Sequence, residues 1–474
     1  MNLAVHGLEG DIREANTFYE DMHTLVGTCD FVMANPPFNV DLVDAEKVDG
    51  DARLPFGLPG VNKQKKVSNG NYLWISYFYS YLNASGRAGF VMSSQASSAG
   101  HGEREVRRKI IETGAVDVMI AIRSNFFYTR SVPCELWFFD RGKPEALRDK
   151  VLMLDARNIY RKVTRKIHDF SPEQLQNLTA IIWLYRGKTD RFLGLVEQYL
   201  DAVSTECASI PEKLGQFEAL IRTQRSHLDA FGKRIEAADT GDSEQGRLLI
   251  EAMSELHDAS DLYEQDRSNL VADIEAFQQS VGTNLLATNE QQHTARQAFD
   301  PIAEKVKGLI KQVDLLYKLA SRATELADDL ASQFPSPSSP RPLGEGQGEG
   351  MTGYDRREIT RLIKQLDTAR KDAVEQLKQA AYFHRQVVWL QDRFPESKLA
   401  DVSGLVKLVD RKEIEAADWS LTPGRYVGVA PEEQDDGFDF DAALRDIHVE
   451  LMSLNEEAGE LAAKIQANFE GLGV

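Results

Sequence analysis

The 474-residue sequence contains only three cysteines, Cys29, Cys134 and Cys207, which are odd in number and far apart. This pattern fits neither a disulfide framework nor a zinc site, and it suits a reducing cytoplasm. No run of about 18 apolar residues is present, so we expect no membrane span. The first residues, MNLAVHGLEGDIREAN, lack a basic segment followed by an apolar core, so we expect no signal peptide.

Several common catalytic signatures are also missing. The sequence has no GxSxG, HExxH or Walker motif, which leaves hydrolase and nucleotidase functions without support. His6, His101 and His168 have no metal-ligand spacing, and we interpret them as surface or hydrogen-bonded core histidines. We therefore predict no metal site.

Negative charge is in excess, but only in one part of the chain. Residues 1–190 contain 24 Lys and Arg against 23 Asp and Glu, a balance of +1, and the other 284 residues contain 31 against 51, a balance of −20. Phosphate neutralisation supplies most non-specific affinity for nucleic acid, so an acidic body binds a polyphosphate poorly. If DNA or RNA is the substrate, we expect a partner to hold it.

Up to about residue 190, short apolar strands alternate with helical stretches. The expected strands are residues 29–34, 87–92, 116–122, 134–139 and 151–156, and expected helices lie at 72–82 and 103–113. Gly114 follows the second helix, where a C′ glycine is common. Alternating apolar strands and helices predict an α/β domain with a largely parallel sheet.

From about residue 191, apolar residues recur with a helical period, as in Val306, Leu309 and Val313. We predict a helical region at 191–334, either a bundle or a coiled-coil arm that reaches a partner. Residues 335–350 contain four Pro, four Gly and three Ser, which predicts a disordered linker. A second helical region for partner contact is expected at 351–474, with an acidic stretch at 432–441 and a last helix at about 442–470.

The string CDFVMANPPFNV is the most informative motif. An apolar strand leads directly into Asn35, Pro36, Pro37 and Phe38. Two successive prolines fix φ and lack amide donors, so the chain leaves the strand along a stiff path. The Asn35 side chain and the Pro36 carbonyl are left as acceptors at the carboxyl end of a strand, where open α/β sheets bind ligands.

These groups suit a planar substrate with an exocyclic amino group. The amino group would donate hydrogen bonds to the Asn35 side-chain oxygen and the Pro36 carbonyl, which localises the nitrogen lone pair for attack. Stacking on Phe38 would hold the ring, with about 1–3 kcal/mol by analogy with other base–aromatic stacks. The alternative interpretation is a structural turn between a strand and a loop.

An NPPF sequence after a strand resembles the catalytic motif of amino-group methyltransferases that use S-adenosylmethionine, most typically N6-adenine DNA methyltransferases. Residues 69–95 are similar to the helix and strand that follow this motif in the modification subunit of type I restriction–modification systems. NFFYTRSVPCELWFF resembles that family's loop whose aromatic side chain stacks on a flipped base, with Phe127 as the first candidate and Tyr128 as the second. SLTPGRYVG is similar to the family's tail, which helps to contact the specificity subunit.

The resemblance implies a Rossmann-like methyltransferase sheet, followed by a helical C-terminal region. It also implies methylation of adenine N6 in double-stranded DNA, and cytoplasmic assembly with a specificity subunit and a restriction subunit. The family carries a helical domain and a strand with a glycine loop ahead of the segment with which this chain begins. We therefore expect residues 1–190 to be the C-terminal portion of the catalytic domain, in a truncated chain that is inactive alone. Asn16 and Asp11 are the candidates near the cofactor's adenine ring.

Basic clusters give two candidate surfaces for DNA phosphates. Each could instead be a solvated surface. The contacts to base edges that determine sequence specificity would lie in the partner subunit. The first surface contains Arg157, Arg161 and Lys162, and the second contains Lys63, Lys65 and Lys66.

The residues leave three functions open. The first is the catalytic subunit of an adenine-specific DNA methyltransferase that acts on a flipped adenine. The second is a methyltransferase with the same motif that acts on a glutamine side chain or on RNA, although such an enzyme would not need the 284 acidic, mainly helical residues. The third is a catalytically inactive assembly subunit whose helical part docks to a partner.

Overall fold

A computed structural model describes residues 2–127, 131–237, 243–283, 286–332 and 356–430. These residues form two compact units. The first comprises the chain up to Thr179 together with the described residues from Leu399 onward, and the second comprises Ala180–Lys398. The chain therefore leaves the first unit, completes the second and returns to the first.

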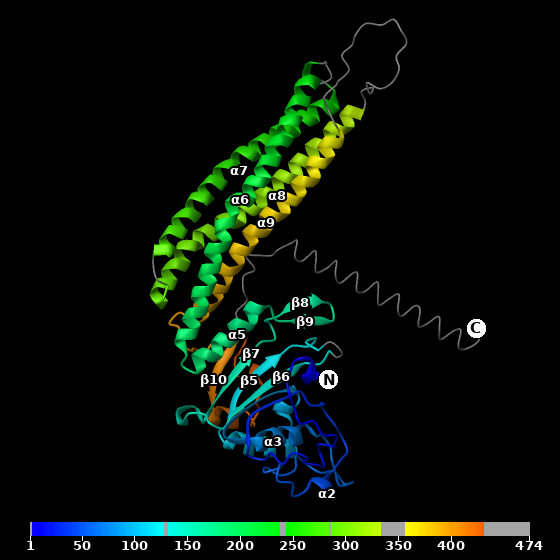
Figure 1. Cartoon of the computed structure of the whole chain (residues 1–474), viewed down its shortest axis with the longest axis vertical. Helices are drawn as coiled ribbons and strands as arrows, with labels where there is room; N and C mark the ends of the chain where they lie inside the picture. Colours follow the sequence, from blue (N-terminus) through cyan, green and yellow to red (C-terminus); the bar gives the residue numbers. More distant parts are fainter. Residues whose placement is uncertain (1, 128–130, 238–242, 284–285, 333–355, 431–474) are drawn as a thin grey trace, which may run out of the picture. The chain divides into compact units, whose positions relative to one another are not determined.

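A six-stranded sheet forms the centre of the first unit (Figure 1). Its strands lie in the order β1, β4, β6, β5, β7, β10. β1 pairs with β4, and β5 with β7, in parallel; β6 is antiparallel to β4 and β5, and β10 to β7. Four strands thus share one direction, which confirms the predicted α/β class with a mostly parallel sheet. The bounds are Cys29–Ala34 (β1), Leu82–Ser93 (β4), Val116–Ile122 (β5), Cys134–Asp140 (β6), Lys150–Asp155 (β7) and Val406–Asp410 (β10).

Burial alternates along the strands because successive side chains point to opposite faces of the sheet. In β4, Phe90 and Met92 are buried in the core, whereas Val91 between them is half-buried. β5 is buried at every position, as expected of a strand covered on both faces. β1 forms the edge of the sheet, where Phe31 is 77% and Met33 94% exposed. Its apolar edge is therefore open to solvent.

Two helices cover the sheet core of the first unit. α3 (Asn71–Tyr81) buries aromatic and aliphatic side chains, and α4 (His101–Glu112) buries an apolar stripe. Gly114 follows α4 with a φ of 75°, a conformation that glycine adopts without a Cβ clash. Both helices agree with the predicted ranges to within two residues. The short elements are α1 (Asn2–Val5), β2 (Val43–Asp44), α2 (Ala45–Val48), β3 (Lys66–Val67), η1 (Ala96–Ser98), η2 (Glu145–Leu147), β8 (Arg161–Thr164) and β9 (Ile167–Asp169).

The segment from Leu399 onward returns to the sheet. β10 pairs with β7 from Val406 to Asp410, and α10 (Arg411–Ala416) and η3 (Pro423–Arg425) follow it. η3 lies against β5 and β7. The sequence pattern predicted a mainly helical region and no strand for residues 351–474, so the structure differs from it at β10. VKLVD is a five-residue strand, and a strand this short has too weak a pattern to be distinguished from helix.

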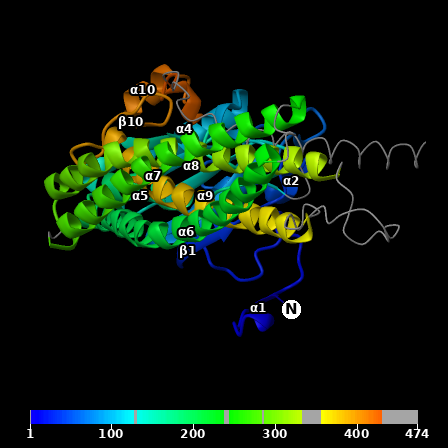
Figure 2. The ribbon, with the colours of Figure 1, turned by 90° about the horizontal axis from the view of Figure 1, so that it is seen from above.

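The second unit is a bundle of four long helices that lie side by side and run up, down, up and down (Figures 1 and 2). Their apolar residues recur three and four positions apart, and in α8 Val306, Leu309 and Val313 are buried. The bundle, rather than an extended arm, is thus the arrangement found. The bounds are Thr189–Ala237 (α6), Glu244–Thr283 (α7), Asn289–Ser332 (α8) and Arg356–Arg393 (α9), and α5 (Pro172–Tyr185) precedes them.

Some predictions cannot be compared with this structure. The linker at 335–350, the acidic stretch at 432–441 and the last helix at 442–470 lie outside the described residues. Among the helices that are described, none is both long and apolar enough to cross a membrane.

Candidate active site

β1 delivers the Asn35–Phe38 turn to the carboxyl edge of the sheet. The Asn35 side chain is exposed, and no group in the described part of the chain hydrogen-bonds to it. Pro36, which contributes the second predicted acceptor, is half-buried. The turn therefore has an amide group that is open to a ligand, at the place where sheets of this class bind them.

Phe38 and Phe127 come together at this edge. Their ring centroids are 6.0 Å apart and the rings are inclined by 69°, an edge-to-face arrangement. Both side chains are half-buried, so each keeps some surface for contact with a ligand. Both residues are predicted from the sequence to contact one planar substrate, and the structure brings them together. Tyr128, the second candidate for stacking, lies outside the described residues.

The loop that carries Phe127 is fixed to the β8–β9 hairpin through His168. The backbone N–H of His168 donates to the Asn125 carbonyl at 2.8 Å. Its ring packs on Tyr160, with centroids 4.8 Å apart, and the Arg123 guanidinium lies 4.0 Å from the Tyr160 ring centroid. Burial lowers the pKa of His168, so the imidazole is neutral near neutral pH. His168 is thus a hydrogen-bonded, buried histidine, as predicted.

A cavity of about 680 Å³ that is wide open to solvent lies between the segment Glu14–Tyr19 and the loop Pro37–Val43. Asn16 lines it, and its Oδ1 accepts a hydrogen bond from the Phe18 backbone at 3.1 Å. Trp74 of α3 contributes an aromatic wall. The indole Nε1–H of Trp74 is buried and has no acceptor among the residues described. Aromatic and apolar walls beside polar side chains suit a heteroaromatic ring.

Asp11, the other predicted cofactor contact, is not among the residues that line this cavity. Its carboxylate lies 2.7 Å from Arg13 and 3.3 Å from His23. The hydrogen bond from Arg13 lowers the pKa of Asp11, so the carboxylate is ionised and already paired. Of the two predicted cofactor contacts, Asn16 therefore lines the cavity and Asp11 does not.

At least four of the six predicted phosphate-binding side chains form ion pairs within the described part of the chain. The Lys65–Glu46 and Arg161–Asp169 pairs are exposed, and such pairs contribute about 0–1 kcal/mol, so they do not prevent an exchange of the carboxylate for a phosphate. Lys63 is exposed and Lys162 is half-buried. A role of these six residues in DNA binding stays a prediction. The ion pairs are Lys65–Glu46, Lys66–Asp44 at 2.9 Å, Arg157–Asp155 at 2.5 Å and Arg161–Asp169 at 2.7 Å.

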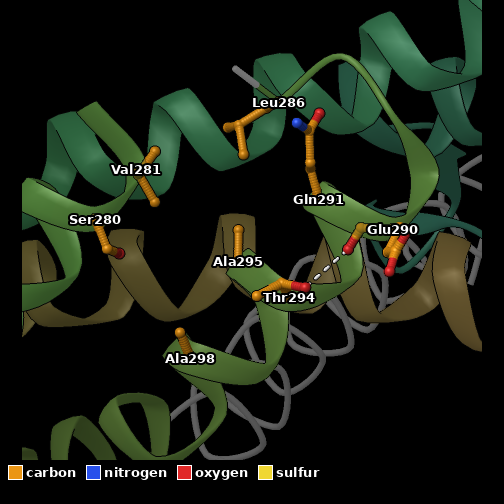
Figure 3. A pocket seen from close by; sticks show the side chains of 8 residues that line it. All are labelled: Ser280, Val281, Leu286, Glu290, Gln291, Thr294, Ala295 and Ala298. Atoms are coloured by element: carbon orange, nitrogen blue, oxygen red, sulfur yellow. Dashed lines mark hydrogen bonds between the residues drawn. The ribbon is translucent and has the colours of Figure 1, made fainter. Parts of the chain in front are cut away.

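A second hollow, of about 430 Å³, lies in the helical unit where α7 meets α8 (Figure 3). Small side chains such as Ser280, Ala295 and Ala298 line it, and the Thr294 hydroxyl donates to the Glu290 carbonyl of its own helix at 2.9 Å.

Within the described ranges, no three His, Cys, Asp or Glu side chains are grouped as a metal site requires. The catalytic candidates therefore concentrate at the sheet edge.

The asparagines that hold the NPPF turn were not predicted from the sequence. The Asn39 backbone N–H donates to Asn71 Oδ1 at 2.8 Å, and Asn71 Nδ2 donates to Asn39 Oδ1 at 2.9 Å. Asn69 Nδ2 also donates to Asn39 Oδ1, at 3.1 Å. The only signal for this contact was the string NGN immediately before α3, and the sequence does not show that it meets the turn.

A buried acid on β6 was also missed. Glu135 accepts a hydrogen bond from the Ser97 hydroxyl at 3.0 Å, and Ser97 in turn lies 2.7 Å from the Thr422 hydroxyl. Burial raises the pKa of Glu135 to about 8, so the carboxyl is largely protonated at neutral pH. This chain of hydroxyl and carboxyl groups joins the sheet to the C-terminal segment.

The chain is similar to known proteins over its first part. Residues 1–199 match the family model described as N-6 DNA Methylase. The methylase subunit of the type I restriction enzyme MjaIX from Methanocaldococcus jannaschii is 38% identical over 194 residues, which are 40% of this chain and 34% of that protein. The methylase subunit of the type I restriction enzyme HindI from Haemophilus influenzae is 28% identical in an alignment of 248 positions that covers 47% of this chain and 54% of that protein.

A solved structure was also found. The methyltransferase subunit of a type I restriction-modification system from Streptococcus thermophilus is 22% identical, covers 38% of this chain and 37% of that chain, and has a TM-score of 0.34. This chain spans about a third of the length of the first relative above and about half of the second. The predicted resemblance is confirmed: residues 1–199, which carry the NPPF turn, match the N-6 DNA methylase family model, and the chain is similar to methylase subunits of type I restriction enzymes.

Proposed function

We propose that the chain transfers a methyl group from S-adenosylmethionine to the N6 amino group of adenine in double-stranded DNA, as the catalytic subunit of a type I restriction–modification complex. One observation carries the proposal. The Asn35 amide, which has no partner in the described part of the chain, lies at the carboxyl edge of the sheet together with two aromatic rings in edge-to-face contact, Phe38 and Phe127. These are the groups that a flipped purine with an amino substituent requires.

The Asn35 side chain and the Pro36 main-chain carbonyl would together select an amino group and activate it. The adenine N6 amino group donates one hydrogen bond to Asn35 Oδ1 and one to the Pro36 carbonyl. With both protons held, the nitrogen lone pair is directed out of the ring plane. Phe38 and Phe127 hold the ring, and stacking on aromatic side chains contributes about 1–3 kcal/mol per base.

The cavity beside Asn16 suits the adenosyl part of S-adenosylmethionine. It opens beside Pro37 of the catalytic turn, and Trp74 presents an aromatic wall and a buried indole N–H without a partner in the described part of the chain. Asn16 and Trp74 would hold the nucleoside there. When bound, the cofactor supplies an electrophilic methyl group.

We expect tight cofactor binding only in the assembled complex. Among the described strands, β1 is the outer strand next to the turn, with Phe31 and Met33 in solvent. A further strand on this edge would pair with the free main-chain groups of β1 and add backbone amides beside the turn. Calorimetry of the isolated 474-residue chain is expected to show no binding up to about millimolar cofactor, the weak end of the affinity scale. Micromolar binding would contradict this expectation.

We also propose that a specificity subunit and a restriction subunit are the partners. The −20 balance of residues 191–474 makes this part a poor surface for DNA. In this arrangement the helical unit serves assembly, and the base contacts that define the recognition site lie in the specificity subunit.

The Asn35→Ala variant tests the proposed function. In the complex assembled with the specificity subunit, it is expected to abolish transfer of a labelled methyl group to a DNA duplex and to leave DNA affinity within a few fold. Asn83→Ala is the matched control, because Asn83 is an asparagine whose amide binds Asp30 at 2.7 Å and takes no part in the turn. Transfer by Asn35→Ala above about a tenth of the wild-type rate, a loss of less than about 1.4 kcal/mol, would exclude the acceptor role. If the label appeared on glutamine or RNA and not on adenine, adenine in DNA would be excluded as the substrate.

A further inference from the structure

The backbone immediately after the NPPF turn is held by reciprocal hydrogen bonds from one buried amide. Asn71 Oδ1 accepts from the Asn39 backbone N–H at 2.8 Å, and Asn71 Nδ2 donates to Asn39 Oδ1 at 2.9 Å. Asn69 supports the pair, since its Oδ1 accepts from the Asn71 backbone N–H at 2.9 Å and its Nδ2 donates to Asn39 Oδ1 at 3.1 Å. One side chain therefore holds both the main chain and the side chain of the residue that follows Phe38.

Asn71 is well suited to hold this position. Its side chain is only 1% exposed, and it begins α3, whose next two residues, Tyr72 and Leu73, are fully buried in the core. Asn39, by contrast, is exposed and has a φ of 54°, in the left-handed region that asparagine tolerates better than most residues. A rigid helix thus fixes an otherwise exposed and strained residue.

The chemistry of the contact requires an amide. The Asn39 N–H needs an acceptor and Asn39 Oδ1 needs a donor, and a carboxamide is a side chain that offers both within one planar group. Aspartate would keep the acceptor but place a second oxygen against Asn39 Oδ1. Alanine would leave both groups of Asn39 without this partner.

We propose that Asn71 is a positioning residue for methyl transfer: by fixing Asn39, it sets the direction in which Phe38 projects toward Phe127. The inference rests on the proposed function, in which the two rings hold the target base. Displacement of a reacting group by about 1 Å can cost about 100-fold in rate. The Asn71→Ala and Asn71→Asp variants are therefore expected to lower kcat by about 10- to 100-fold, with the KM for DNA unchanged within a few fold.

The experiment uses the complex assembled with the specificity subunit and compares wild type, Asn71→Ala, Asn39→Ala and the double variant. If Asn71 acts through Asn39, the double variant is as slow as the slower single variant, because residues in one network do not contribute additively. A duplex with 2-aminopurine at the target position reports base extrusion by its fluorescence, which is expected to fall in each variant. Asn83→Ala is the control and is expected to match wild type.

A second measurement does not depend on activity. Hydrogen exchange of the peptide that contains Asn39 is expected to accelerate in Asn71→Ala, because the Asn39 N–H loses its acceptor, while the α4 and β5 peptides keep wild-type rates. Unchanged exchange at Asn39, or a kcat above half of wild type, overturns the inference. An equal acceleration of hydrogen exchange in all peptides also overturns it, since this would show general destabilisation. If the wild-type complex does not methylate adenine, the proposed function fails, and the exchange result alone decides whether Asn71 holds the turn.

Discussion

Arg107 of α4 donates a hydrogen bond of 2.6 Å to the carbonyl of Trp419, in the C-terminal segment of the first unit. The same guanidinium donates to the Ala99 carbonyl at 2.7 Å and to the Tyr72 hydroxyl at 3.1 Å, and the side chain is 1% exposed. It therefore joins three parts of the chain, α3, the segment after β4 and the returning segment, inside the folded core.

Replacement of Arg107 is expected to destabilise the first unit. Arg107→Ala removes the guanidinium donor from the carbonyls of the half-buried residues Ala99 and Trp419, and each loss of a partner costs up to about 1–3 kcal/mol. We expect the free energy of unfolding to fall by about 2–4 kcal/mol, measured by urea denaturation followed in the near-ultraviolet circular dichroism of the core aromatics. Arg108→Ala is the control, since Arg108 forms surface pairs with Glu105 and Glu112 that are worth little. Equal changes in the two variants would contradict a structural role specific to Arg107.

Phe127→Ala is expected to weaken the hold on the target base. The loss of one base–aromatic contact of about 1–3 kcal/mol corresponds to about 5- to 150-fold in the population of the extruded base. Phe127→Tyr keeps the ring and is expected to retain most of the activity. Fluorescence of 2-aminopurine at the target position and single-turnover methylation in the assembled complex measure the two quantities. If the alanine and tyrosine variants behave alike, the ring of Phe127 does not hold the base.

The isolated chain is expected to bind a DNA duplex weakly and without sequence preference, because its acidic part opposes phosphate binding. Addition of the specificity subunit is expected to confer site-selective binding. Band-shift titrations at near-physiological salt measure the affinity for a cognate and a scrambled duplex. They are carried out with the isolated chain and with the chain plus the specificity subunit. Discrimination between the duplexes by the chain alone would refute the assignment of specificity to the partner.

Glu135 predicts a pH dependence of stability. Burial raises its pKa from the ordinary 4.5 to about 8, with Asp155, Arg157 and Arg107 as its charged neighbours. Between these values the folded protein keeps a proton that the unfolded chain releases, so the free energy of unfolding falls as pH rises, by up to about 1.4 kcal/mol per pH unit. Glu135→Gln retains a hydrogen-bonding group and is expected to remove this slope. Urea denaturation from pH 5 to pH 9, with Glu112→Gln as an exposed control, measures it; identical slopes for Glu135→Gln and wild type would contradict the prediction.

The strands and helices of the first unit were predictable because each has a strong local pattern. CDFVMA, VDVMIAI and CELWFF are apolar runs bounded by turns, and the structure contains all three as strands. The NPPF turn was predictable for the same reason, since its stiffness lies in two adjacent prolines. The base-stacking role of Phe127 was predictable only from the family resemblance, because no local pattern shows that its loop meets Phe38.

The contacts that were not predicted join residues far apart in the chain. Asn71 meets Asn39, and Ser97 meets Thr422, through hydrogen bonds that depend on the three-dimensional path of the chain. Glu135 looked like an ordinary charged residue in an apolar strand, and only its burial shows that it is held protonated. A sequence pattern records which residues face a core, but it does not record which polar groups meet within it.

The paired strands β7 and β10 are synthesised far apart in time. The ribosome makes β7 roughly 250 residues before β10, an interval of about 12 to 50 s at ~5–20 residues per second. Throughout this interval the helices of the second unit can form from local contacts, whereas the β7 edge waits for the partner strand that covers it. An unpaired strand edge is a template for association with other chains. The nascent protein is therefore most exposed to misassembly while its helical bundle emerges, and a chaperone or a partner that shields β7 during these seconds would raise the yield of folded protein.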